Sequence, residues 1–335
     1  MQKSKKLLIR LSSAGDVLLT SPLLRLMKER EPGCEIHFLV KSQYADLIRL
    51  NPNVNRVHLV QDQPTSRQLE DTRQSLIGEK FEATLDLHNN FRSIYLRRGT
   101  APDIRKVKKD IIKRAILVNA KLNLFSTVRS VALKYAQTYD KSVTSVSRPE
   151  FYLPSECVAT ADELWMSSGS EPRQAVFLCP GARHFTKRWP TAYWKEIAAK
   201  LQPHGRVVLL GGPADAEACN NIQEGTSALN LCGKLSLTES TAMLRHASVV
   251  VTNDSYLMHA ANALGKKVVA IFGSSVREFG FFPYGIENRV MEVSGLSCRP
   301  CSHLGLESCP RGHFKCMKDT LPAAVEEAAA SLLRD

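Results

Sequence analysis

Short apolar runs alternate along the chain with longer stretches whose apolar residues recur at helical spacing. In the first half the runs fall at 6–11, 35–40, 56–60 and 83–87, separated by helical stretches at 21–30, 44–50 and 67–78. A short apolar run is typical of a buried strand, and strands that alternate with helices form a parallel sheet covered by helices. The pattern restarts at residue 175 and ends in a helical stretch at 321–333. The sequence therefore predicts two α/β units, each built on a parallel sheet.

The boundary between the two units is marked by residues that interrupt regular structure. Pro149, Pro154, the Ser-Ser-Gly-Ser run at 167–170 and Pro172 lie between the alternating halves. A length of 335 residues suits two domains of ordinary size. We expect a first Rossmann-like domain at 1–155, an inter-domain region at 156–174, a second Rossmann-like domain at 175–320 and a C-terminal helix at 321–335.

Positive charge is concentrated in the first half. Residues 1–150 hold 27 Lys and Arg against 15 Asp and Glu, whereas residues 151–335 hold 18 of each. Such asymmetry indicates a polyanionic partner: nucleic acid, an anionic membrane surface or a phosphorylated substrate, with a solvated basic surface as the alternative. The segment 97–114 combines eight cations with interleaved apolar residues. It is either an amphipathic segment that contacts anionic lipid or phosphate, or a solvated helix face.

The sequence contains no apolar run near the roughly 20 residues that a membrane-spanning helix needs. The apolar stretch at 7–11 contains Arg10 and lacks the length and the cleavage site of a signal peptide. We therefore expect a cytoplasmic protein.

The first candidate site is the turn of small residues that follows the first strand and ends at Asp16. In open parallel sheets ligands bind at the carboxyl ends of the strands. A carboxylate there can act as a general base toward a hydroxyl group, or it can cap the following helix. The turn lacks the G-x-G-x-x-G spacing of dinucleotide-binding enzymes, which disfavours a nicotinamide-dependent dehydrogenase.

The second candidate site is the basic loop at 180–190, placed between a strand and a helix that we expect to begin near Pro190. It contains Thr186, Lys187 and Arg188. Cations beside the amino end of a helix favour a bound phosphate, so Lys187 or Arg188 could neutralise a diphosphate leaving group. A solvated basic loop is the alternative.

The third candidate site lies at 252–259, again at the passage from a strand to a helix. Asp254 and Ser255 stand where the helix opens, so both can cap it. The Asp254 carboxylate could also bind sugar hydroxyls. His259, one turn into the helix, is either a ligand contact or a packed histidine.

Four of the nine cysteines cluster near the end of the sequence, as Cys298, Cys301, Cys309 and Cys316. Their C-x2-C-x7-C-x6-C spacing suits a tetrahedral zinc ion, and in a cytosolic protein such a cluster favours metal over disulfides. A set of buried thiols that pack a loop is the alternative. The other five, Cys219 and Cys232 among them, are scattered singly, and several lie in apolar stretches typical of small core residues.

Taken together, these segments resemble glycosyltransferase family 9, the bacterial heptosyltransferases. The resemblance covers most of the chain in the family's order. It rests on LIRLSSAGDVL at 8–18, LDLHNN at 85–90, CPGA at 179–182, KRWP at 187–190, GGP at 211–213, GKLSL at 233–237, TNDS at 252–255 and MH at 258–259. The family usually has glycine where this chain has Tyr256, and the larger side chain could reshape the donor site.

The resemblance implies a GT-B fold, in which two Rossmann-like domains face a central cleft and bind acceptor and donor respectively. It implies an inverting transfer of heptose from ADP-heptose to the inner core of lipopolysaccharide, with no cofactor required. Asp16 would be the catalytic base, Lys187 would contact the donor phosphates and Asp254 would hold the donor sugar. Further donor phosphate contacts are expected from Thr186, Arg188, Ser255 and His259, and acceptor contacts from Ser12, Ser13, Gly15, Asn89 and Arg92.

The basic first half suits an anionic lipopolysaccharide precursor as acceptor and peripheral contact with the inner membrane. Three other functions remain open. Two keep the fold: a transferase with another nucleotide-sugar donor, and a nucleotide-sugar epimerase or hydrolase. The third is a nucleic-acid-binding module, which would bind unrelated duplexes with strong salt dependence. The sequence shows no nucleic-acid motif, so we expect no nucleic-acid partner.

Overall fold

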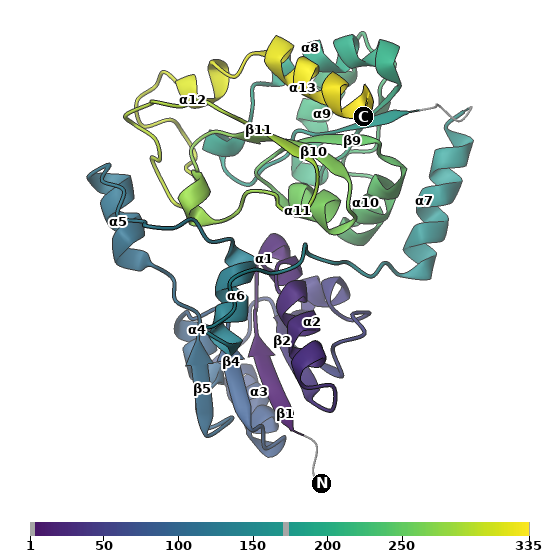
Figure 1. Cartoon of the computed structure of the whole chain (residues 1–335). Helices are drawn as coiled ribbons and strands as arrows, with labels where there is room; N and C mark the ends of the chain where they lie inside the picture. The colour runs from purple at the N-terminus through teal and green to yellow at the C-terminus, as the bar shows by residue number, and fades with distance from the viewer. Residues whose placement is uncertain (1–3, 170–173, 335) are drawn as a thin grey trace. The chain divides into compact units, whose positions relative to one another are not determined.

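The computed structural model describes residues 4–169 and 174–334. It divides into two compact units (Figure 1). Unit 1 comprises Met1–Lys109 and Ser130–Tyr152, and unit 2 comprises Asp110–Arg129 and Leu153–Asp335. The division after Tyr152 lies close to the predicted domain end at 155. No local sequence pattern indicated that residues 110–129 join the second unit. Residues 170–173 of the expected inter-domain region lie outside the described residues.

Unit 1 is built on a five-stranded parallel sheet in the order β3-β2-β1-β4-β5 within the described residues. Its strands are β1 (Lys5–Ile9), β2 (Glu35–Lys41), β3 (Arg56–Val60), β4 (Ala83–Asp86) and β5 (Asp103–Lys106). Its helices are α1 (Ala14–Leu18), α2 (Ser21–Arg30), the 3-10 helix η1 (Ser42–Leu47), α3 (Ser66–Gly78), α4 (Phe91–Leu96) and α6 (Val131–Tyr139).

The central strands of unit 1 are apolar because both faces of the sheet are covered. Leu7, Leu8 and Ile9 of β1 have no exposed surface. Local signals set the helix starts: Pro22 stands in the first turn of α2, and Thr65 caps α3 by accepting a hydrogen bond from the Gln68 amide. The predicted strand–helix alternation is therefore confirmed in this unit.

Unit 2 holds a six-stranded parallel sheet in the order β11-β10-β9-β6-β7-β8, counted over the same described part of the chain. The strands are β6 (Ala175–Cys179), β7 (Arg206–Leu209), β8 (Leu229–Asn230), β9 (Val249–Asn253), β10 (Lys267–Phe272) and β11 (Asn288–Glu292). The α-helices are α5 (Ile111–Asn119), α7 (Ser155–Ser167), α8 (Thr191–Leu201), α9 (Ala216–Gln223), α10 (Leu237–Met243), α11 (Tyr256–Ala263), α12 (Lys315–Lys318) and α13 (Pro322–Arg334).

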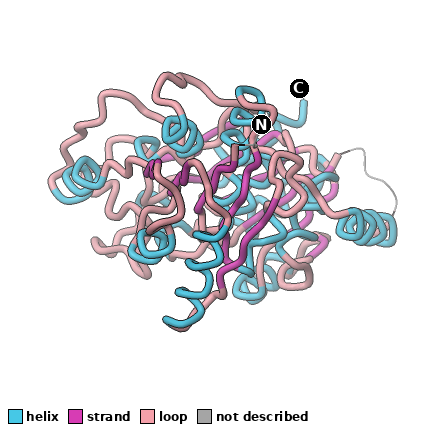
Figure 2. Tube along the Cα trace, turned by 90° about the horizontal axis from the view of Figure 1, so that it is seen from below, coloured by secondary structure: helices cyan, strands magenta, loops and turns pink. Residues whose placement is uncertain are grey.

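Short 3-10 helices join several of these elements: η2 (Phe185–Lys187), η3 (Gln202–His204), η4 (Pro213–Asp215), η5 (Leu244–His246) and η6 (Arg277–Phe279). Strands β6 and β9 are buried along their whole length, and helices and loops surround the strands (Figure 2). Across the described residues, no helix combines the length and the apolar character that crossing a bilayer requires.

The basic segment at 97–114 is divided among several elements. It covers the residues after α4, the edge strand β5 and the start of α5. Its last residues, from Asp110 on, belong to unit 2. It therefore does not form the single amphipathic segment that the charge pattern suggested.

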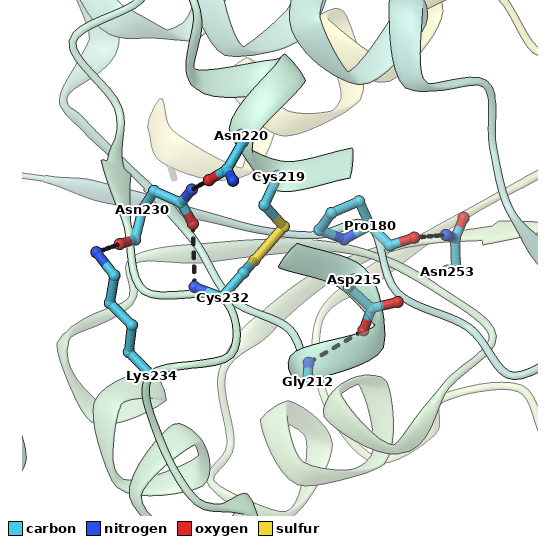
Figure 3. Close-up of a disulfide and its surroundings, with 9 residues drawn as sticks. All are labelled: Pro180, Gly212, Asp215, Cys219, Asn220, Asn230, Cys232, Lys234 and Asn253. Carbon is cyan, nitrogen blue, oxygen red and sulfur yellow. Dashed lines mark hydrogen bonds between the residues drawn. A yellow bond between two sulfur atoms is a disulfide. The ribbon is translucent and has the colours of Figure 1, made fainter. Parts of the chain in front are cut away.

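The structure joins Cys219 of α9 to Cys232 by a disulfide bond (Figure 3). The interpretation of these two cysteines as single, scattered core residues is therefore wrong. Both are buried, Cys232 in the segment that follows β8. Nothing in the sequence paired them, because the bond depends on how α9 packs beside β8.

Candidate active site

Two neighbouring strands of unit 1 bring the first group of predicted site residues together. Ile9 of β1 is paired with Asp86 of β4, so the segments that follow these strands begin side by side at the carboxyl edge of the sheet. Ser12, Ser13, Gly15 and Asp16 lie on the first segment, and Asn89 and Arg92 lie on the second. The structure thus places all the predicted acceptor residues on two adjacent connections.

The Asp16 carboxylate is held by three side chains. Arg10 Nη2 lies 2.7 Å from Asp16 Oδ2, and Ser13 Oγ donates to the same oxygen at 2.9 Å. Tyr135 of α6 donates its hydroxyl to Oδ1 at 3.1 Å. Asp16 is also the third residue of α1, where its carboxylate bonds to the capping residue Ser13. The alternative that Asp16 is the capping residue is therefore wrong: Ser13 caps α1, and Asp16 supports that cap from the third helical position.

These contacts keep Asp16 ionised. Burial would raise the pKa of Asp16, but the Arg10 charge and the hydrogen bonds from Ser13 and Tyr135 offset it, so the pKa lies below its ordinary value. Side-chain exposure is only 17% for Asp16 and 12% for Arg10. The Asp16 carboxylate is therefore an anion at neutral pH, held in a fixed position by its three partners.

The connection after β4 is fixed by the fully buried Asp86. One carboxylate oxygen accepts the backbone amides of His88 at 3.0 Å and Asn89 at 2.7 Å, and the other accepts Ser93 Oγ at 2.9 Å and Arg97 Nη1 at 2.7 Å. The Asn89 amide nitrogen in turn donates to the Val107 carbonyl at 3.3 Å. Asn89 therefore shapes the loop, whereas Arg92 is half-buried at the start of α4.

Three residues that the sequence analysis did not select complete this cluster. In the sequence, Arg10 was noted only as a charge within an apolar run. In the structure its Nη1 also donates to the Leu87 carbonyl at 2.7 Å, so Arg10 joins the connection after β1 to the connection after β4. Tyr135 is 119 residues from Asp16, so no local pattern could indicate it. His88 stands beside them, and burial, with help from the Arg10 charge, lowers its pKa to about 3, which leaves the ring neutral.

The second cluster lies in unit 2, at the carboxyl ends of the paired strands β6 and β9. Cys179 is paired with Thr252, which brings the loop at 180–190 beside the segment at 254–255. Lys187 Nζ lies 2.6 Å from Asp254 Oδ2, and Ser275 Oγ donates to that oxygen at 2.8 Å. Burial would raise the pKa of Asp254, but Lys187 and then Ser275 offset it, so the pKa is lowered.

The buried Asn253 holds both ends of the loop at 180–190. Its amide nitrogen donates to the Pro180 carbonyl at 2.7 Å (Figure 3), and its oxygen accepts the Trp189 backbone amide at 3.3 Å. At the start of the loop, an added Cβ on Gly181 would lie 2.2 Å from the Asp215 carboxylate. A side chain at this position would therefore displace the Asp215 carboxylate.

Two predicted phosphate-binding residues form hydrogen bonds within this framework. Thr186 is buried, and its hydroxyl accepts the Leu306 amide at 2.8 Å. Arg188 Nε donates to the Ala182 carbonyl at 2.6 Å. Both side chains therefore stabilise the loop that carries Lys187, and their contact with phosphate stays a prediction.

Helix α11 begins where the sequence predicted. Ser255 is its capping residue but makes no side-chain capping bond, so its hydroxyl is free of that role. His259 is buried, and its charge interaction favours the ionised form of Asp254. The Tyr256 hydroxyl lies 2.8 Å from Thr241 Oγ1 on α10. The large Tyr256 side chain is therefore tied to the neighbouring helix.

The four clustered cysteines line one small cavity of about 20 Å³ together with His313. Cys298 Sγ lies 3.7 Å from His313 Nε2, and burial raises the pKa of Cys301 and brings that of Cys316 to about 12. In the described part of the chain, no three of these donors lie within 4.8 Å of one another. The donor types fit zinc, but the spacing is wider than a closed tetrahedral site.

Comparisons with known proteins agree with this architecture. The family model of glycosyltransferase family 9 (heptosyltransferase) matches residues 70–308, which span both units. The chain is 26% identical over 329 residues to lipooligosaccharide heptosyltransferase 2 of Campylobacter jejuni, and the match covers 96% of each chain.

Two solved structures share the fold over nearly the whole chain. The glycosyl transferase family 9 protein of Veillonella parvula superposes with a TM-score of 0.84 at 22% identity, covering 100% of this chain and 98% of that one. The ADP-heptose lipopolysaccharide heptosyltransferase II of Escherichia coli gives a TM-score of 0.75 at 23% identity and 98% coverage of both.

Two parallel-sheet α/β units of this kind define the GT-B class of glycosyltransferases. Within that class, the chain belongs to glycosyltransferase family 9, the heptosyltransferases. The predicted fold class and enzyme class are thereby confirmed.

Proposed function

We propose that this glycosyltransferase moves heptose from ADP-heptose onto the inner core of a lipopolysaccharide precursor, with inversion at the anomeric carbon. The family match and the names of the relatives support heptose transfer in lipopolysaccharide biosynthesis. The ADP-activated donor is supported by the description of the Escherichia coli structure. The observation that carries the mechanism is the Asp16 carboxylate, fixed and ionised at the carboxyl edge of the unit 1 sheet.

In the proposed reaction the acceptor hydroxyl oxygen forms the new bond to the anomeric carbon while the bond from that carbon to the diphosphate oxygen breaks. The electron pair leaves with ADP, and the hydroxyl proton passes to Asp16. A carboxylate with a lowered pKa suffices, because the hydroxyl becomes strongly acidic as its oxygen bonds to the electron-poor carbon. Arg10, Ser13 and Tyr135 hold the carboxylate in place for that transfer.

Lys187 is proposed to stabilise the departing diphosphate. Its ammonium group is fixed beside Asp254 on a loop whose ends are tied to Asn253. A pre-positioned cation of this kind is typically worth roughly 3–4 kcal/mol to a transition state that gains negative charge. Asp254 is then proposed to accept hydrogen bonds from the sugar, with Ser275 and Lys187 keeping it ionised.

We further propose that the protein acts at the cytoplasmic face of the inner membrane, where an anionic, lipid-linked acceptor is present. Helix α5 supports peripheral contact: Ile111 and Ile112 are 68% and 75% exposed, next to Lys113. Exposed apolar side chains among cations suit the boundary of an anionic lipid surface.

The proposed transfer uses no metal. We propose the four cysteines at 298–316 as a structural zinc site only, supported by their donor type and their shared cavity. Their present spacing requires the sulfurs to move together on binding. Elemental analysis of the purified protein tests this, because a zinc content per chain that is the same in wild type and in the Cys298→Ser, Cys301→Ser double variant removes the idea.

The decisive experiment incubates the purified protein with ADP-heptose and a heptose-free lipopolysaccharide precursor. We expect ADP release together with an acceptor mass gain of one heptose, and neither change with Asp16→Asn. An incubation without acceptor separates the alternatives that keep the fold, because a hydrolase or an epimerase would consume the donor there. ADP release without an acceptor mass gain, or transfer from a UDP- or GDP-sugar in preference, contradicts the proposal.

A further inference from the structure

A second group of ionisable side chains lies in unit 1, on β2 and β3 and after α3. His37 of β2 is paired with Arg56 of β3, and His58 follows two residues later. Side chains two residues apart on a strand share one face, so His37 and His58 are diagonal neighbours. Glu79, the residue after α3, reaches the same place. The strand β3 is the edge of the sheet.

The donor atoms of these three residues are close enough for one metal ion. His37 Nδ1 lies 3.0 Å from His58 Nε2 and 4.0 Å from Glu79 Oε2, and all three donor atoms lie within 4.8 Å of one another. Within the described residues, this is the one group of three such donors with that spacing. A tetrahedral zinc ion with bonds of about 2.0–2.2 Å needs donors roughly 3.3–3.6 Å apart. The observed distances lie on both sides of that value, so shifts of under an ångström would close the site.

The surroundings give this group the outer support typical of a metal site. His37 is buried, and the Phe81 ring lies nearly perpendicular to both imidazole rings, with centroid distances of 5.2 Å to His37 and 6.3 Å to His58. Arg56 Nη1 donates to Glu79 Oε1 at 2.5 Å. That bond orients the carboxylate while leaving Oε2 available to a metal, as the outer partners of metal-bound carboxylates do.

One neighbour opposes a bound cation. Lys5 Nζ lies 3.3 Å from Glu79 Oε2, the oxygen that a metal would take. Its side chain is 36% exposed, so it can move into solvent. Metal and Lys5 therefore compete for the same oxygen, and removal of this lysine should strengthen binding.

We propose that His37, His58 and Glu79 bind a divalent zinc ion, which ties the edge strand β3 and the end of α3 to β2. Two imidazoles and one carboxylate are a ligand set that zinc accepts, with water in the fourth position. The site is separate from the sulfur donors at 298–316, which lie in unit 2. It does not depend on the proposed transfer reaction.

The test titrates the full-length, chelator-treated protein with zinc by calorimetry and records its thermal unfolding with and without zinc. We expect binding to weaken at least about 100-fold in His58→Asn, since even outer-shell changes cost 10–100-fold. Lys5→Met should bind more tightly than wild type, and His204→Asn, which alters an exposed histidine in unit 2, should match wild type. Zinc should raise the Tm of wild type by more than it raises that of His58→Asn.

The absorption spectrum of bound cobalt(II) distinguishes metal at this site from metal bound by the cysteines. Thiolate ligands give intense charge-transfer bands in the near ultraviolet, whereas a nitrogen and oxygen site gives only weak visible bands. We expect one cobalt per chain to give the weak bands, separately from any cobalt that the cysteines bind, and these weak bands should be lost in His58→Asn and in Glu79→Gln. Three results would overturn the proposal. They are equal metal binding by wild type and His58→Asn, cobalt spectra with thiolate bands alone, and a Lys5→Met variant that binds micromolar zinc no more tightly than wild type does. Because Lys5→Met keeps all three ligands, its result stands even where His58→Asn folds poorly.

Discussion

The Arg10 guanidinium lies 2.7 Å from the Asp16 carboxylate and, through its other nitrogen, 2.7 Å from the Leu87 carbonyl. One side chain thus connects the segment after β1 to the segment after β4. Any change at Arg10 alters both the charge state of Asp16 and the relative position of the two connections that carry the predicted acceptor residues.

Asp16→Asn should abolish most turnover while leaving ADP binding intact. The amide has the same shape but cannot accept the hydroxyl proton, and loss of a general base typically costs about 10²–10⁴-fold. Steady-state rates with ADP-heptose and acceptor, together with ADP calorimetry, measure the two effects. Ser13→Ala, which removes one of the three side chains that donate to Asp16, serves as the milder control. Full activity in Asp16→Asn would assign the base elsewhere.

Arg10→Gln should shift the acidic limb of the kcat/KM profile to higher pH. Arg10 lowers the pKa of Asp16, so its removal raises that pKa, and Asp16 becomes protonated at a higher pH on acidification. Arg10→Lys keeps a charge and should restore part of the shift. Rates measured across the acidic range test this, and an acidic limb in the same place for all three proteins would show that Asp16 is not the group that titrates.

Lys187→Ala should weaken ADP binding and slow transfer. The ammonium is the proposed partner of the diphosphate, and its loss also leaves Asp254 without its ion-pair partner. Calorimetry with ADP, UDP and GDP measures both affinity and selectivity; wild type should prefer ADP. Lys195→Ala, which removes a half-exposed lysine on α8, is the matched control. Unchanged ADP affinity in Lys187→Ala would contradict the phosphate role.

The stability difference between wild type and Asp254→Asn should shrink in acid. At pH 7 the variant breaks a buried ion pair, which typically costs about 3–5 kcal/mol. The pKa of Asp254 in the folded protein is lowered. The ion pair therefore contributes fully to the free energy of unfolding above the ordinary aspartate pKa of about 3.9, and this contribution is lost as the pH falls through the lowered pKa of Asp254. Urea unfolding at pH 7 and below pH 4 measures the difference. Asp319→Asn, at an exposed position, should show no such trend.

The sequence predicted the sheets well because buried parallel strands leave a strong local pattern. The runs that became β1, β2, β6 and β9 are rich in apolar residues, and the connections after β1, β6 and β9 carry Asp16, Lys187 and Asp254 respectively. The edge strand β5 was missed because it lies in a charged segment, where exposure removes the apolar signal.

The partners of the site residues could not be predicted in the same way. Tyr135 reaches Asp16 from α6, and Ser275 reaches Asp254 from the segment after β10. Such contacts depend on the packing of distant elements, which no local spacing records. The family resemblance located the carboxylates, but only the structure shows the side chains that set their charge.

The assignment of residues 110–129 to unit 2, between two parts of unit 1, has a practical consequence for dissecting the protein. The chain passes from one unit to the other three times, so no single cut separates two complete folding units. A fragment ending at Tyr152 would keep α5 but lose its packing partners, among them Phe279, which lies under Arg114, and the Pro300 carbonyl, which accepts from Lys121. Separate expression of the two units would therefore require two changes. In unit 1 a short linker would replace residues 110–129, and unit 2 would need residues 110–129 supplied as a separate peptide.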